Sequence, residues 1–158
     1  METIATLTRR LSHPGTVAWI GLRPARRAAM VATTEATLTP EGLAGDHARP
    51  GKRAVTLVQA EHLPVIAAFC GSDVVDPAQL RRNILVQGIN LLALRHRHIR
   101  IGTAILEVTG PCAPCSRMEE ALGPGGYSAV RGHGGVTASV VEPGRLSVGD
   151  PIEALAAP

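Results

Sequence analysis

Residues 99–118 read IRIGTAILEVTGPCAPCSRM and combine a structural signal with a chemical one. Two short apolar runs, 99–101 and 104–109, flank the pair Gly102-Thr103. Two such runs joined by a glycine-containing turn predict an antiparallel β-hairpin. A loop with two cysteines follows the hairpin at once, so thiol groups are expected where a strand ends.

Short apolar runs of the same kind recur along the chain. Seventeen glycines and twelve prolines are spread among the 158 residues and separate these runs. The predicted strands are 16–22, 29–37, 54–59, 83–87, 99–101, 104–109, 136–141 and 146–148. A second hairpin is expected at Glu142-Pro143-Gly144-Arg145. Because many short antiparallel strands must hide their edges, the fold class is mainly β, with a barrel-like closed sheet.

The helical signals are fewer and shorter. Residues 61–69 place apolar side chains roughly on one face, Asp76-Pro77 is typical of the start of a helical turn that runs to Arg81, and residues 116–122 precede a Gly-Pro stop. Three short helices should therefore decorate the sheet of a single domain over residues 1–158. The alanine-rich end, residues 152–158, is expected to fray.

Composition excludes several classes of protein. Hydrophobic residues make up 45% and charged residues 18%, which argues against intrinsic disorder. Aromatic residues are only 2%, too few for a stacking platform that binds single-stranded nucleic acid. No run of 18 apolar residues predicts a membrane span, and Arg9 and Arg10 stand where a signal peptide would be hydrophobic. We therefore expect neither nucleic acid nor membrane as a partner, and a cytoplasmic protein.

The net charge of +3 comes from arginine, because Lys52 is the only lysine. A guanidinium group is planar and matches phosphate and carboxylate, so an anionic ligand is a reasonable expectation. An excess of this size is equally compatible with an ordinary solvated surface. Charge alone does not choose between the two interpretations.

The loop Gly110-Pro111-Cys112-Ala113-Pro114-Cys115-Ser116-Arg117 is the most specific chemical feature. Cys115 stands where a helix should begin, and Arg117 is close by in sequence, so the pKa of its thiol is expected to be lowered. The pair could form a redox couple, half of a zinc site completed by His47 or His133, a soft ligand to the metal of a cofactor, or a carrier of sulfane sulfur. An inert cysteine in a tight loop is also possible.

Other basic and polar segments are candidates for anion binding. Arg81-Arg82-Asn83 precedes a predicted strand and could clamp a phosphate, although exposed arginines would look the same. His133 lies in a glycine-rich loop whose amides could line an anion, and a surface loop is the alternative. His96 and His98 could face one way on a strand, but a solvated basic turn is the better interpretation.

Taken together and in order, these segments resemble the MOSC domain, the family named for the C-terminal domain of molybdenum cofactor sulfurases. The resemblance covers most of the chain. Its motifs are Gly42–His47, Ala54–Leu57, Glu61–Leu63, Arg81–Ile84, Ile101-Gly102, Leu106–Val108, Pro114-Cys115, Gly135–Ala138 and Val148–Asp150.

The resemblance implies a β-barrel-like fold, in agreement with the strand pattern. It also implies that Cys115 would ligate the molybdenum of a pterin-based cofactor (molybdopterin) or carry a persulfide, with Cys112 as a helper or bystander. The same resemblance makes Arg81 and Asn83 residues that approach the cofactor and places Glu61 and His62 on the same pocket. Arg117 and the His133 loop are further candidates for binding the cofactor phosphate.

Three functions follow as hypotheses from these residues. The first is an oxidoreductase that acts on N-hydroxylated or related small molecules through a cysteine-ligated molybdenum. The second is a sulfur carrier with a persulfide on Cys115, and the third is a non-catalytic module that binds the cofactor or a small anion. The first two need a separate redox partner or sulfur donor protein. The oligomeric state does not follow from the sequence.

Overall fold

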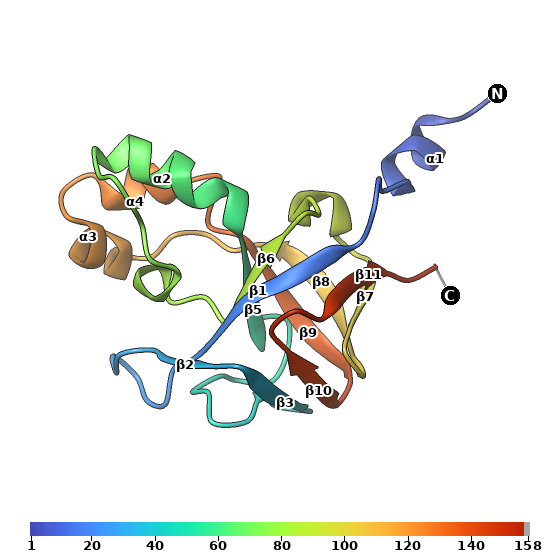
Figure 1. Cartoon of the computed structure of the whole chain (residues 1–158), viewed down its shortest axis with the longest axis horizontal. Helices are drawn as coiled ribbons and strands as arrows, with labels where there is room; N and C mark the ends of the chain where they lie inside the picture. Colours follow the sequence, from blue (N-terminus) through green and yellow to red (C-terminus); the bar gives the residue numbers. More distant parts are fainter. Residues whose placement is uncertain (157–158) are drawn as a thin grey trace.

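A closed barrel forms the centre of the computed structural model, which describes residues 1–156. Seven strands follow one another in the order β11-β7-β8-β9-β5-β6-β1, and pairing of β1 with β11 closes the ring (Figure 1). They are β1 (Gly15–Leu22), β5 (Val55–Gln59), β6 (Ile84–Gln87), β7 (His98–Ile101), β8 (Ala104–Pro111), β9 (Val136–Glu142) and β11 (Pro151–Ala154). Neighbouring strands are antiparallel except β5 and β6, which run parallel.

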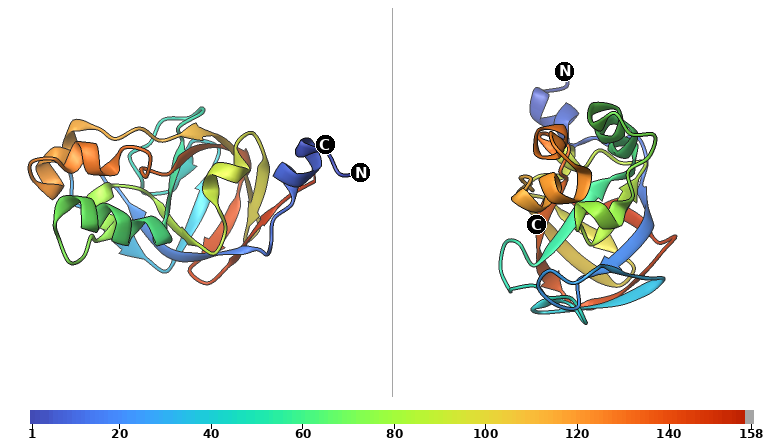
Figure 2. Two further views of the ribbon diagram at one scale, coloured as in Figure 1. Left: turned by 90° about the horizontal axis from the view of Figure 1, so that it is seen from above. Right: turned by 90° about the vertical axis from the view of Figure 1, so that its left-hand side faces the viewer.

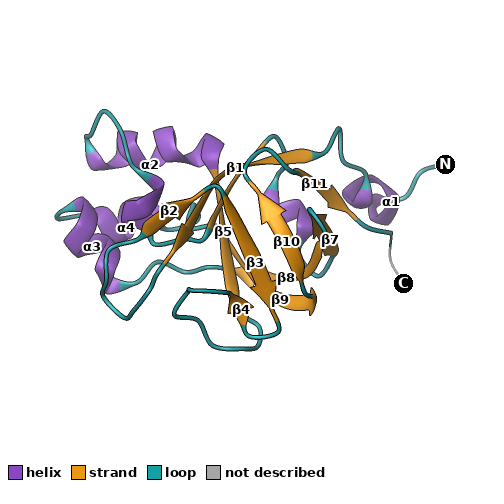
Figure 3. Cartoon of the chain, turned by 60° about the horizontal axis from the view of Figure 1, so that its bottom comes forward, coloured by secondary structure: helices purple, strands orange, loops and turns teal. Residues whose placement is uncertain are grey.

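A smaller sheet lies against the barrel. It has the order β10-β3-β4, formed by Gly144–Ser147, Glu35–Thr39 and Gly42–Leu43, and it appears among the strands of Figure 3. Leu38 and Leu146 from this sheet belong to the same buried cluster as the interior of the barrel. One further strand, β2 (Val31–Thr33), extends the large sheet beyond β1.

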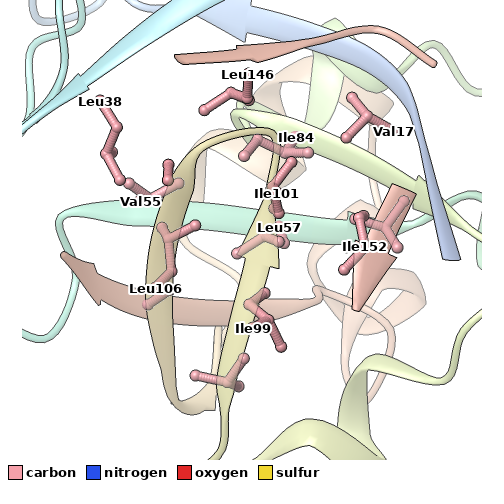
Figure 4. Packing of buried hydrophobic residues seen from close by; sticks show 14 of the residues in the cluster. Val17, Leu38, Val55, Leu57, Ile84, Ile99, Ile101, Leu106, Leu146 and Ile152 are labelled. Carbon is pink, nitrogen blue, oxygen red and sulfur yellow. The ribbon is translucent and has the colours of Figure 1, made fainter. Parts of the chain in front are cut away.

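The interior of the barrel is packed with aliphatic side chains. Along β8, Leu106 and Val108 are fully buried, whereas Ile105 and Glu107, which alternate with them, are half-buried, as expected of a strand with one face inward. Figure 4 shows Leu106 converging with residues from other strands, such as Leu57. Each such side chain stabilises the fold by about 1.5–3 kcal/mol when it leaves water.

Short helices cover the outer side of β5 and create a second core. They are α2 (Leu63–Cys70), α3 (Ser116–Leu122) and α4 (Gly126–Val130), which gather beside one end of the barrel (Figures 1 and 2). Val58 on β5 packs there with Ile66 and Met118, while its neighbour Leu57 points into the barrel. All five residues of β5 are therefore buried.

The remaining helical segments are α1 (Ile4–Arg9), η1 (Ala60–His62), η2 (Pro77–Leu80) and η3 (Leu91–Leu94). The start of η2 confirms the predicted capping at Asp76, whose carboxylate accepts a hydrogen bond from the amide of Ala78 at 2.9 Å. By contrast, α1 has no buried residue and lies near the chain termini (Figure 3). Within residues 1–156, no helix is both long and apolar enough to cross a membrane.

The mainly β fold with a closed barrel is as predicted, and so is the hairpin at Gly102-Thr103, which joins β7 to β8. The hairpin predicted at Glu142–Arg145 is wrong, because β9 and β10 do not pair. At Gly144 the chain leaves the barrel, and β10 pairs with β3 of the smaller sheet. The strand predicted over 29–37 is likewise two strands, β2 and β3, which belong to different sheets.

The expectation that residues 152–158 fray is also wrong for residues 152–154. Residues 151–154 form β11, which pairs with β7 and β1, and Ile152 is completely buried in the barrel. Alanine-rich composition misled here, since one buried isoleucine outweighs weak β propensity. Residues 157–158 lie outside the described part of the chain. The elements α1, α4 and η3 and the parallel pair were not predicted from the sequence.

Replacing Ile152 tests this closing strand. Ile152→Ala should lower the free energy of unfolding by about 2–5 kcal/mol, because it leaves a cavity in a packed core. Denaturant unfolding followed by circular dichroism measures the change. The neighbouring exposed residue gives the control, since Glu153→Ala should change stability by no more than about 0.5 kcal/mol. Equal small effects of both variants would contradict the role given to β11.

Candidate functional site

The loop between β8 and α3 carries Cys112 and Cys115 in different environments. The amide of Cys112 donates to the carbonyl of Gly135 at 2.8 Å, which continues the β8–β9 pairing, and Cys112 is buried. Pro114 disfavours a helical conformation at Ala113, and the backbone of Cys115 is still extended with φ of −123° and ψ of 171°, so α3 begins only after Cys115, its N-cap residue. Buried Met118 fixes the helix on the second core, and Cys115 is left exposed.

Both cysteines line a cavity of about 360 Å³ beside this loop. Seven of its lining residues are arginines, supplied by segments that are far apart in sequence. The full lining is Arg23, Ala25, Arg26, Arg27, His47, Arg53, Thr56, Arg81, Arg82, Cys112, Ala113, Cys115, Ser116 and Arg117, and we call this site the arginine cleft. The protein as a whole has a net charge of only +3, so the cleft concentrates its positive charge.

Arg82 is the most buried of these arginines, with 6% of its surface exposed. Its guanidinium donates to three backbone carbonyls: Gly134 at 2.8 Å, Leu80 at 3.1 Å and Ala113 at 3.2 Å. Burial lowers the pKa of Arg82, and the thiols of Cys112 and Cys115 oppose that shift. Arg82 therefore fastens the cysteine loop and the glycine-rich loop to the barrel.

Asn83 lies behind the cleft and is completely buried. Its amide oxygen accepts from the backbone and the hydroxyl of Thr56 at 3.1 and 3.2 Å, and its amide nitrogen donates to Asp46 at 3.1 Å. Asp46 in turn accepts from both side-chain and backbone nitrogens of Arg23. Asn83 is thus a supporting residue whose polar atoms are occupied by the protein, and it does not line the cleft.

Arg81, by contrast, reaches the cleft. Its backbone is left-handed with φ of 57°, and its guanidinium donates to the carbonyl of Ala28 at 2.6 Å. Burial, followed by the positive charges of Arg117 and Arg23, lowers the pKa of Arg81. A guanidinium remains charged at neutral pH despite such shifts. An anion in the cleft would relieve this crowding of like charges.

The residues predicted as one site separate into two groups. Cys115, Arg81 and Arg117 meet in the arginine cleft, with Asn83 behind it. Glu61 and His62 instead line a second cavity of about 500 Å³, together with Gln59, His13, Gly88, Ile89, Asn90 and Leu92, and this lining shares no residue with the cleft. The ring of His133 lies edge-on to His62 with centroids 5.0 Å apart.

Burial and neighbouring groups shift the pKa values of His62 and Glu61 in this second group. Burial lowers the pKa of His62, and the nearby His133 lowers it further. For Glu61, burial raises the pKa, but hydrogen bonds from Gln59 and the amide of Gly88 outweigh it and the pKa lies below its ordinary value. The Nδ1 atom of His133 is buried without a protein partner. The lining of this second cavity contains no cysteine.

Sequence reasoning missed Arg23, Arg26, Arg27 and Arg53 as members of the cleft. The signal was the dense run Arg23-Pro24-Ala25-Arg26-Arg27 just after β1, but nothing local shows that this run folds back toward Cys115. Across residues 1–156, no three histidine, cysteine, aspartate or glutamate side chains gather closely enough to hold a metal ion by themselves. Of the two histidines considered as zinc ligands, His47 lines the cleft with Cys112 and Cys115, whereas His133 does not.

Comparison with known proteins agrees with this architecture. The model of the MOSC domain family matches residues 39–153. The chain belongs to the MOSC family. That family is associated with binding of the molybdenum cofactor. No curated protein matches the chain.

Solved structures show the same fold. The YuaD protein from Bacillus subtilis is 18% identical with a TM-score of 0.79, and the match covers 94% of this chain and 100% of that one. YiiM from Escherichia coli is 23% identical with a TM-score of 0.71 over 92% of this chain and 70% of its own. YiiM from Geobacillus stearothermophilus is 16% identical with a TM-score of 0.71, over 90% and 76%. At these identities the likeness concerns the fold alone.

The adjacent arginines 81 and 82 should respond differently to substitution. Arg82→Gln should lower the free energy of unfolding by about 3 kcal/mol, because buried carbonyls lose a charged donor. Arg81→Asn should cost no more than about 1 kcal/mol, since asparagine tolerates the left-handed backbone and a single hydrogen bond is lost. Denaturant unfolding of the two variants makes the comparison. Similar losses in both would argue against the anchoring role of Arg82.

Proposed function

We propose that this MOSC domain binds a molybdenum–pterin cofactor in the arginine cleft, with Cys115 as the thiolate ligand, and reduces N-hydroxylated or related small molecules. The observation that carries the proposal is the position of Cys115: its side chain is exposed and lines a cavity rich in guanidinium groups. A thiolate is a soft ligand, and arginines bind anionic groups, so one cavity offers both kinds of contact.

The residues present fit such a cofactor. The cleft volume of about 360 Å³ lies within the range of about 300–1,000 Å³ typical of sites for small molecules and cofactors. Arg81 and Arg117 lie beside Cys115 in its lining and would bind the phosphate group. Arg82 would act indirectly, because its hydrogen bond to the carbonyl of Ala113 holds the loop between the two cysteines.

When bound, the molybdenum centre would supply two-electron oxygen-transfer chemistry. The protein's own contribution is to bind and orient. Arg82 and the proline residues restrict the loop that presents Cys115, and the arginines compensate negative charge on the bound group. Electrons would come from a separate redox partner. Glu61 and His62 take no part in this proposal, because they line a different cavity, and His133 packs against His62 outside the cleft.

Metal content tests the role of Cys115. Protein purified from a host that makes the cofactor should contain molybdenum, and Cys115→Ser should lower the molybdenum-to-protein ratio at least about tenfold, since a primary ligand is lost. Elemental analysis by mass spectrometry measures the ratio. Cys70→Ser is the matched control, because Cys70 lies on α2 outside the cleft, and it should retain the metal. Equal molybdenum in the Cys115→Ser protein would contradict the assignment.

Turnover is a separate question with its own experiment. Cofactor-loaded protein supplied with a reduced viologen dye should convert an N-hydroxylated base to the corresponding amine, and Cys115→Ser should remove this activity. Formation of the amine is followed by chromatography. Stable cofactor binding without any reduction would instead favour the non-catalytic module.

A sulfur carrier is the second candidate, and the same exposed thiol favours it. Because Cys115 is exposed to solvent, a donor protein can deliver sulfane sulfur to it. A buried cysteine such as Cys112 could not be reached in this way. Incubation with a cysteine desulfurase and cysteine, followed by mass spectrometry, distinguishes this function. The added mass of one sulfur atom on Cys115 would support it, and an unmodified Cys115 would oppose it.

A further inference from the structure

Two of the arginines in the cleft have strained backbones. Within residues 1–156, only three residues other than glycine have positive φ, and these are Arg27 at 66°, Arg81 at 57° and His96 at 64°. Arg27 and Arg81 both line the arginine cleft. A left-handed backbone is unfavourable for such side chains and glycine would avoid the strain, so two strained residues in one cavity indicate a functional demand there.

The two strained residues are physically connected. Arg81 donates a hydrogen bond of 2.6 Å to the carbonyl of Ala28, the residue directly after Arg27. The amide of Ala28 also donates to the carbonyl of Ala25 at 3.1 Å, which closes a turn around Arg26 and Arg27. The turn is therefore held against the cleft from the side of Arg81. The side chains of Arg26 and Arg27 line the cavity as a result.

The positive charge in the cleft exceeds what one phosphate needs. Of the seven arginines, Arg23 is paired with Asp46 and Arg117 is weakly paired with the exposed Glu120 at 3.6 Å. Across residues 1–156 the other five have no carboxylate partner. A phosphate monoester carries a charge of about −1.5 to −2 at neutral pH. After one such phosphate is bound, most of the positive charge of these five arginines is still uncompensated.

The arginines without a carboxylate partner differ in how deeply they are buried. Arg81 and Arg82 are half-buried and buried, whereas Arg26, Arg27 and Arg53 are exposed at the rim. Arg53 lies just before β5, so the rim is built from two separate segments. Among the inner arginines, Arg82 donates to three carbonyls and Arg81 to one, while no hydrogen bond engages the rim side chains within the described chain. The rim set therefore has its donors available.

We propose that Arg26, Arg27 and Arg53 form a second anion subsite, the rim subsite, which binds a phosphate group in addition to the anionic group beside Cys115. This inference rests on the proposed function, because it assumes that the inner part of the cleft receives the cofactor. The ligand class is a phosphate ester or diphosphate of a small molecule. That phosphate belongs either to the substrate or to a nucleotide extension of the cofactor.

A small anion fits these observations better than an acidic protein surface. Arg27 lines a cavity of about 360 Å³ and has a left-handed backbone with φ of 66°. Docking of a protein would need no such strain, since arginines on an ordinary convex surface serve long-range attraction equally well.

Titration of the cofactor-free protein with inorganic pyrophosphate tests the rim subsite. Isothermal titration calorimetry at fixed, low ionic strength should show that Arg27→Asn weakens binding about tenfold, the loss expected for one charge-assisted contact. Asparagine adopts the left-handed backbone, so the turn should persist. The control Arg100→Gln removes the same charge from the exposed face of β7, at the far end of the barrel in Figure 1, and should change affinity less than about twofold.

Arg27→Gly guards against a simple folding defect. Glycine adopts this backbone freely, so the melting temperature should not fall below that of the wild type, while pyrophosphate binding weakens as it does in Arg27→Asn. Loss of affinity without loss of stability is what a binding role requires. If both variants bind pyrophosphate as tightly as the wild type, the rim subsite is overturned, and an acidic protein partner would then be the better explanation for the rim.

A comparison with cofactor-loaded protein identifies the source of the phosphate. If loading abolishes pyrophosphate binding, the rim holds an extension of the cofactor. If the loaded protein still binds pyrophosphate through Arg27, the rim serves the substrate. If Arg117→Gln removes pyrophosphate binding while Arg27→Asn does not, the cleft has a single anion site beside Cys115, and the rim subsite fails while the proposed function stands.

Discussion

One buried guanidinium joins the segments that build the cleft. Arg82 donates to carbonyls at positions 80, 113 and 134, which belong to η2, the cysteine loop and the glycine-rich loop. No water can replace it there without leaving carbonyls unpaired, so the charge and its three acceptors are fixed together. The position of Cys115 depends on this anchor, because the loop that carries it has few buried side chains of its own. Stability and the presentation of the thiol are therefore coupled at one residue.

The barrel could be predicted from sequence because its signals are local. Alternating burial along β8, the glycine turn at Gly102 and the cap at Asp76 each depend on neighbours within a few residues. The elements that were predicted wrongly depend instead on segments far away in the sequence. Gly144 looks like a hairpin turn, but its strand pairs with β3, more than a hundred residues earlier in the chain, and Ile152 belongs to a strand only because β1 and β7 flank it.

The candidate site divides in the same way. Cys115 could be identified because two cysteines, two prolines and a predicted helix start occur together in one loop. Asn83 was expected to approach a ligand, yet its position behind the cleft follows from a pairing with Thr56 on a parallel strand that has no local signature. The contribution of Arg27 was invisible for a related reason, since the turn that carries it is joined to Arg81, which is distant in sequence.

Closure of the ring by β1 and β11 has a consequence for how the chain folds. The two strands are separated by most of the sequence, so the barrel gains its last pairing only after a costly long-range contact has formed. During synthesis β1 leaves the ribosome early, and one edge of β1 stays unpaired until β11 has been made. We therefore expect a slow final folding step, during which the nascent chain depends on protection from aggregation.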